Sequence, residues 1–223
     1  MPPLLDEHHA KEIDDAAEEL FRDTFHRRRT PPTLPYPVES AFKDLQLTVG
    51  WVEMATMLPA VQSLAFLCVP HRAVLVDESL HPNEAPELRS RLRFTFAHEI
   101  GHWCLHRREL DVAMGWSRRD PTREVVREQE ANRFAGALLI PATMLRESWR
   151  HVFGMQPIRR ENLLPVRSQL IRDEVFRRRF RPIGEDAAEN LMFEGAVSGI
   201  AANFGVSPQA LRIRAEELGL IVR

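Results

Sequence analysis

The stretch RFTFAHEIGHWCLH, residues 93–106, decides how the rest of this chain is interpreted. It is largely apolar, as expected of a helix in a protein core, and it contains HEIGH at 98–102. Residues four apart on an α-helix lie on one face, about 6 Å apart along the axis. The imidazoles of His98 and His102 are therefore expected to bind one zinc ion, each at about 2.0–2.1 Å.

Glu99 lies one step round the same helix from His98. It is too far aside to bind the same ion, but it can reach a water molecule at that ion. In helical zinc peptidases the two histidines bind the metal, and the intervening glutamate removes a proton from the water. The motif therefore predicts that Glu99 is the catalytic base of a zinc peptidase. The alternative is that both histidines are ordinary packed side chains.

A catalytic zinc site needs a third protein ligand and an open fourth position. The segment EQEAN at 128–132 is the best source of that ligand. Glu128 and Asn132 are four apart and share a helix face. Glu128 is thus expected to bind the metal while the Asn132 carbonyl accepts the free ring N–H of a ligand histidine. Glu130 is the open alternative, but it points roughly 160° away from Asn132 and would lose that support.

Two other residues of the first motif have expected roles outside the ligand set. His106 lies roughly 12 Å along the axis from His98, too far for all three histidines to bind one ion on a straight helix. It is expected to be structural or to face the substrate. Gly101 costs a helix about 1 kcal/mol relative to alanine, so its presence predicts that another element approaches closely there.

Bulk composition limits the class of protein. The 223 residues have a formal net charge of -2 and are 44% hydrophobic, which favours a folded domain and gives no general reason to expect nucleic acid or a membrane as partner. Two cysteines cannot build a disulfide scaffold. The N-terminus lacks a signal-peptide pattern, and no run approaches the roughly 18 apolar residues of a membrane helix. The chain is expected to be soluble and cytoplasmic.

The chain divides into three expected parts, which are an N-terminal helix with a proline-rich segment (1–38), a core (39–155) and a helical tail (156–223). The polar segment 107–120 is expected to be a loop over the site. Hydrophobic periodicity and apolar runs predict the remaining elements: helices at about 6–28, 39–47, 90–105, 121–140 and 142–153, and two adjacent strands or a hairpin at 64–69 and 72–77. The tail, 196–221, has the pattern of a helix-turn-helix.

RFTFAHEIGHWCLH followed by EANRFAGALLIP (130–141) resembles the paired motifs of the ImmA/IrrE family of metallo-endopeptidases. The resemblance is strong over about 90–145 and looser over 196–221. It implies a mostly helical α+β, zincin-like domain with a small antiparallel sheet, zinc held by His98, His102 and a glutamate of the second block, and Glu99 as base. Many relatives cleave a helix-turn-helix repressor or antitoxin, which derepresses phage, mobile-element or stress genes.

Some functional details stay open at this level. The strand 72–77 is expected to hold an extended substrate by edge pairing. The oxyanion donor is undecided among Tyr36, His106 and Arg91. Manganese is a possible metal besides zinc. Two rival functions remain, a DNA-binding regulator with a structural metal and a binding module that sequesters a repressor or toxin without cutting it. The eight arginines of 159–181 are expected to form a solvated helix face or to dock an acidic partner.

Overall fold

The computed structural model describes residues 5–57, 64–83, 88–113, 121–159 and 185–222. The chain forms two compact units, Met1–Leu139 and Ile140–Arg223. The first 38 residues belong to the same unit as the HEIGH and EQEAN segments. The expected division at residues 38 and 155 stays a prediction about how the chain folds.

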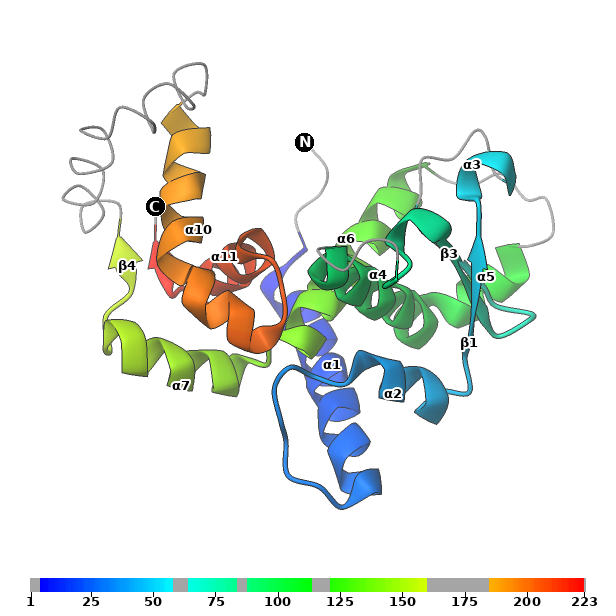
Figure 1. The fold of residues 1–223 in the computed structure, drawn as a ribbon, viewed down its shortest axis with the longest axis horizontal. Coiled ribbons are helices and arrows are strands. Elements are labelled where there is room, and N and C mark those ends of the chain that lie inside the picture. The colour runs from blue at the N-terminus through cyan, green and yellow to red at the C-terminus, as the bar shows by residue number, and fades with distance from the viewer. Residues whose placement is uncertain (1–4, 58–63, 84–87, 114–120, 160–184, 223) are drawn as a thin grey trace. The chain divides into compact units, whose positions relative to one another are not determined.

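The first unit combines helices with a small sheet (Figure 1), so the α+β class and the mostly helical content are as expected. Its described elements are α1 (Glu7–Arg28), α2 (Val38–Asp44), β1 (Thr48–Val52), α3 (Met54–Met57), β2 (Ala65–Cys68), β3 (Ala73–Asp77), η1 (Glu78–Leu80), α4 (Arg89–Gly101), η3 (His102–His106), α5 (Arg107–Ala113) and α6 (Pro121–Leu139).

The sheet has the strand order β1-β3-β2. β2 and β3 form the expected antiparallel hairpin, with Phe66 opposite Leu75. β1 pairs with the other side of β3 in parallel, with Gly50 opposite Leu75. The chain between β1 and β3 contains β2, so it reverses twice and β3 runs in the direction of β1. The sheet is therefore mixed rather than wholly antiparallel, and β3 is its central strand.

Helix α1 forms where the sequence predicts it and packs on α6. The Asp6 side chain caps its first turn by accepting a hydrogen bond from the His9 backbone N–H at 2.8 Å. Arg133 of α6 donates to the Ala10 carbonyl at 2.9 Å and to the Asp14 carboxylate at 2.8 Å. These bonds tie the start of the unit to a helix more than a hundred residues later.

Helices α4 and α6 approach each other closely at Gly101. A Cβ built at Gly101 would lie 3.2 Å from the Cα and the carbonyl oxygen of Ala131 and 3.2 Å from the Phe134 Cβ. Contacts that short leave no room for a side chain, so the expected close approach at Gly101 is confirmed. The crossing brings the HEIGH segment of α4 against the EQEAN segment of α6.

The helix that contains HEIGH continues further than the sequence predicts. After Gly101 it passes through a π-helical turn, η3, and then through α5 to Ala113. The expected loop at 107–120 is therefore wrong for 107–113, and 114–120 lie outside the described residues. Arg107 explains part of this continuation, because its guanidinium donates to the carbonyls of Trp103 and Cys104 and supports the turn.

The second unit contains α7 (Ala142–Phe153), β4 (Ile158–Arg159), α10 (Glu185–Phe204), α11 (Pro208–Glu217) and β5 (Ile221–Val222), with β4 and β5 paired in parallel. The helix, turn and second helix predicted within 196–221 are confirmed. Gly205 turns with φ +64, and the Ser207 side chain caps α11 by accepting from the Ala210 N–H at 3.1 Å. Most of the arginine-rich stretch, 160–181, lies outside the described residues. None of the described helices is long and apolar enough to span a bilayer.

Candidate metal centre

The imidazoles of His98 and His102 converge as their spacing predicts. Their Nε2 atoms are 3.0 Å apart, and Glu128 of α6 places one carboxylate oxygen 3.3 Å from His98 Nε2 and the other 3.2 Å from His102 Nε2. Three donors about 2.05 Å from a tetrahedral ion would be about 3.3 Å from one another. The donor set and its spacing therefore fit a tetrahedral zinc site with one open position. Of the described residues, these three form the candidate metal-binding cluster.

Asn132 stands where the sequence analysis expects it. Its Oδ1 atom is 3.0 Å from His98 Nδ1, the ring nitrogen that faces away from Glu128 and His102. An amide oxygen can only accept, so this contact places the His98 hydrogen on Nδ1. The lone pair of Nε2 is then available to a metal, and the ring orientation is fixed.

The structure brings Glu128 rather than Glu130 to the two histidines. Glu130 is 3% exposed and binds other partners, with His106 Nε2 at 2.6 Å and His9 Nε2 at 2.7 Å. Burial raises the pKa of this carboxyl, but the hydrogen bonds from His9 and His106 outweigh it and hold the pKa below its usual range. Glu130 is thus an ionised acceptor buried behind the site.

His9 is the residue of this neighbourhood that sequence reasoning missed. It lies on α1, 121 positions before its partner Glu130. The N-terminal region carries two adjacent histidines, but no spacing rule connects either of them to α6. The sequence does single out Glu130 and His106, but it assigns neither of them a partner.

Glu99 lies beside the three donors and is 6% exposed. Burial raises the pKa of its carboxyl, and the nearby His98 and His102 partly oppose that effect. The backbone of Leu67, in β2, hydrogen bonds to the carboxylate. A carboxylate whose pKa is raised in this way is suited to take up a proton and release it again.

The contact between Leu67 and Glu99 indicates that β2, rather than the strand at 72–77, is the strand available to pair with a substrate. The sequence analysis assigned edge pairing to 72–77, but β3 is paired on both sides, by β1 and by β2. That assignment is wrong, because a central strand has no backbone groups left to offer a substrate. Of the two edge strands of this sheet, β2 is the one whose backbone, at Leu67, hydrogen bonds to Glu99.

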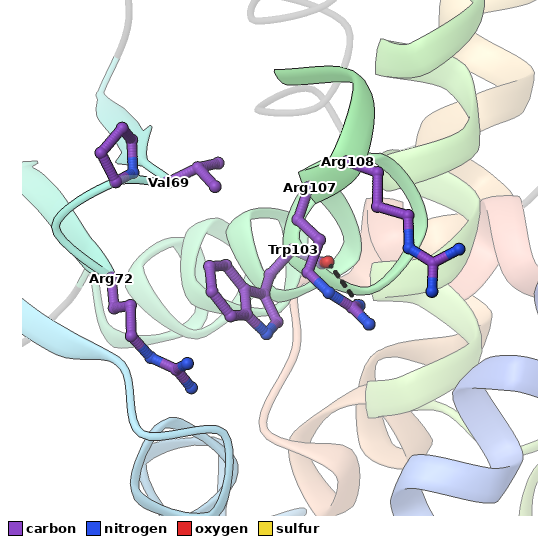
Figure 2. Close-up of a pocket in the computed structure, with 6 residues that line it drawn as sticks. Val69, Arg72, Trp103, Arg107 and Arg108 are labelled. Atoms are coloured by element: carbon purple, nitrogen blue, oxygen red, sulfur yellow. Dashed lines mark hydrogen bonds between the residues drawn. The ribbon is translucent and has the colours of Figure 1, made fainter. Parts of the chain in front are cut away.

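A pocket of about 430 Å³ marks where the β2–β3 turn meets η3. Figure 2 shows the Trp103 indole between the side chains of Arg72 and Arg107, whose guanidinium carbons are 5.0 and 5.8 Å from the ring centroid. Arg72 also donates to the Leu45 carbonyl at 2.6 Å. Cation–π stacking of this kind fastens the turn to the helix and so holds the β2 edge beside Glu99.

Two of the three proposed oxyanion donors are engaged elsewhere. Tyr36 is fully buried, and its hydroxyl pairs with the Thr24 hydroxyl at 2.8 Å. His106 uses both ring nitrogens, one toward His102 at 3.1 Å and one toward Glu130. Arg91 is exposed on α4 and is the donor that stays open among the three.

Comparison with known proteins agrees with the geometry. Residues 70–156 match the peptidase M78 family model, which is described as the IrrE N-terminal-like domain. The match begins at the β2–β3 turn and ends just after α7, so it contains all three candidate metal ligands, Glu99 and Asn132. A search of curated proteins returned no match for the chain.

Proposed function

Because residues 70–156 match the IrrE N-terminal-like domain model, we propose that the protein is a zinc-dependent endopeptidase that cleaves a helix-turn-helix repressor or antitoxin. The observation that supports the chemistry is the convergence of His98, His102 and Glu128 beside the buried Glu99. The substrate class follows from the resemblance of the paired motifs to the ImmA/IrrE family. Cleavage of such a regulator in the cytoplasm would relieve repression.

Each residue around the site has a separate role in peptide hydrolysis. A bound zinc or manganese ion would lower the pKa of a water molecule and polarise the scissile carbonyl. Glu99 takes a proton from the attacking water and returns it to the leaving amine. An extended substrate pairs with the β2 edge, which passes Glu99 at Leu67. Asn132 keeps the His98 ring in the orientation that ligation requires.

The DNA-binding alternative loses its main support in the second unit. A DNA-binding helix-turn-helix would read bases with its second helix, here α11, but the arginines of α11, Arg212 and Arg214, are buried. Arg212 donates to Glu194 at 3.1 Å and to Glu216 at 2.9 Å, and Arg214 donates to Glu217 at 2.9 Å. Side chains neutralised in this way do not supply the net positive, base-reading surface that a groove-entering helix needs.

The first test compares metal content and cleavage in wild type, Glu128→Gln and Glu99→Gln. Wild type is expected to hold one zinc per chain and to cut a purified helix-turn-helix regulator supplied as substrate, with fragments identified by mass spectrometry. Glu128→Gln should lose the zinc. Glu99→Gln should keep it and lose about 10²–10⁴-fold in rate, the usual contribution of a positioned base.

The outcomes separate the rival functions. Full cleavage by Glu99→Gln would overturn the assignment of the base. A wild-type protein that binds the regulator tightly, retains zinc and leaves the regulator intact would support the sequestering module instead. Absence of both zinc and manganese after reconstitution with each metal would remove the metallopeptidase proposal altogether.

A further inference from the structure

A series of hydrogen bonds runs from the candidate metal site to the N-terminal helix. His102 Nδ1 is 3.1 Å from His106 Nδ1, His106 Nε2 is 2.6 Å from one Glu130 oxygen, and the other Glu130 oxygen is 2.7 Å from His9 Nε2. His106 is 2% exposed, and Glu130 is 3% exposed. We call His106, Glu130 and His9 the supporting network.

The chemistry of the metal site fixes the direction of every bond in this series. His102 points Nε2 at His98 and Glu128, so ligation leaves its ring hydrogen on Nδ1. Two facing nitrogens cannot both carry hydrogen, and His106 Nδ1 must therefore accept. The His106 hydrogen is then on Nε2, where it meets a carboxylate that can only accept.

We propose that His106, Glu130 and His9 are positioning residues for the metal site, and that the N-terminal helix thereby contributes to metal binding although it lies outside residues 70–156. This inference rests on the metal-binding part of the proposed function. The Glu130 carboxylate, which His9 holds from its other side, keeps His106 in one tautomer, and His106 in turn holds the His102 ring with its lone pair toward the ion.

A purely structural explanation would assign the network to holding α1 on α6. That docking already has separate contacts, because Arg133 of α6 bonds the Ala10 carbonyl and the Asp14 carboxylate. His9 is also half exposed and so contributes little packing. His9 Nε2 instead donates a hydrogen bond to one oxygen of the buried Glu130 carboxylate, and the other oxygen accepts a hydrogen bond from His106.

Two substitutions of His106 each keep one of its two hydrogen bonds and remove the other. Asparagine places an amide atom near the position of Nδ1, so His106→Asn keeps an acceptor for His102 and loses Glu130. Glutamine places its nitrogen near the position of Nε2, so His106→Gln keeps a donor for Glu130 and loses the acceptor. Zinc affinity, measured by competition with a chelator, is expected to fall about 10–100-fold in His106→Gln. The loss in His106→Asn should be clearly smaller.

Adjacent histidines provide a matched pair on α1. His9→Ala removes one donor to Glu130 and should weaken zinc binding. The effect should be smaller than that of His106→Gln, because the His9 ring is partly solvated and Arg123 also lies 3.6 Å from the same Glu130 oxygen. His8→Ala is the control, since its side chain is 85% exposed and pairs, among the described residues, with Glu12 on the same helix at 3.5 Å. It should leave zinc affinity unchanged. Melting of the metal-free variants is recorded in parallel.

The results that would overturn the positioning role of the network differ from those that would overturn the proposed peptidase activity. Equal zinc affinity in His106→Asn and His106→Gln, or affinities that simply follow melting temperature, would reduce the network to a packing role. If wild type binds neither zinc nor manganese, the proposed function fails and the network is judged by nitrogen-15 NMR of the metal-free protein at about pH 8. A His106 hydrogen on Nε2, lost from that position in Glu130→Ala, supports the network, and a hydrogen on Nδ1 contradicts it.

Discussion

Replacing Gly101 by alanine tests whether the α4–α6 crossing sets the geometry of the metal centre. The added Cβ would lie 3.2 Å from the Cα and carbonyl oxygen of Ala131 and from the Phe134 Cβ. Carbon atoms prefer separations of about 3.5–4.0 Å, so relief requires a shift of a few tenths of an ångström. Backbone atoms of α6 cannot rotate away, and therefore the two helices must separate.

Two contributions of opposite sign determine how Gly101→Ala changes the free energy of unfolding. Alanine is favoured over glycine in a helix by about 1 kcal/mol. Overpacking a filled site costs about 1–3 kcal/mol. Gly101→Ala is therefore expected to change stability by about 0 to 2 kcal/mol in the unfavourable direction. Zinc binding should suffer more, because ligand distances tolerate only about 0.2 Å and Glu128 moves with α6 while both histidines move with α4.

The assay measures chemical denaturation and zinc affinity for Gly101→Ala beside Gly199→Ala. Gly199 is also inside a helix, α10, but a Cβ there meets nothing within 4 Å. The control should gain about 0.5–1 kcal/mol and keep its zinc affinity. Gly101→Ala with the same gain in stability and unchanged zinc affinity would refute the reasoning that the crossing fixes the site.

Three further substitutions test the contacts around the site. Asn132→Ala frees the His98 ring and should weaken zinc binding about 10–100-fold with little change in stability, and an unchanged affinity in chelator competition would contradict this role. Arg133→Ala removes two bonds between α1 and α6 and should cost about 1.5–3 kcal/mol in denaturant unfolding, while a loss near zero would show that α1 docks by apolar packing alone. Asp77→Ala removes the cap of η1 and should cost about 1 kcal/mol at pH 7. Hydrogen bonds at Ser79 hold the pKa of Asp77 below its usual value, so its contribution should be present above the unfolded pKa, near 3.9, and vanish as the pH falls through the folded pKa. A penalty equally large in strong acid would contradict that account.

The local rules of helices account for what the sequence could predict. Spacing by four residues placed His98 with His102 and Glu128 with Asn132, and the cost of a helical glycine predicted the close approach at Gly101. Each of these inferences depends on a single helix and its period. The hairpin of β2 and β3 followed in the same way from two apolar runs separated by a short turn.

The misses all depend on long-range pairing or on small energy differences. No local rule relates His9 to Glu130, since their contact forms only after α1 docks on α6. The central position of β3 depends on β1 returning from an earlier part of the chain. Residues 107–113 are polar and were expected to be a loop, but a preceding helix and the Arg107 contacts extend helical structure into them.

The π-helical turn η3 has a consequence for the length of this segment among related chains. Four steps of a regular α-helix overshoot a full turn by about 40°, and a turn with one more residue takes up that overshoot. The wide turn brings His106 into line with His102 and amounts to one residue inserted after the HEIGH motif. A relative that had lost that residue would keep its three metal ligands and its base, but a histidine at the same alignment column would lie three residues after the second ligand instead of four, so its ring would approach that ligand from a different direction. The number of residues between the HEIGH motif and the position of Arg107, rather than the presence of a histidine, would then show which relatives share the contacts that His106 makes here.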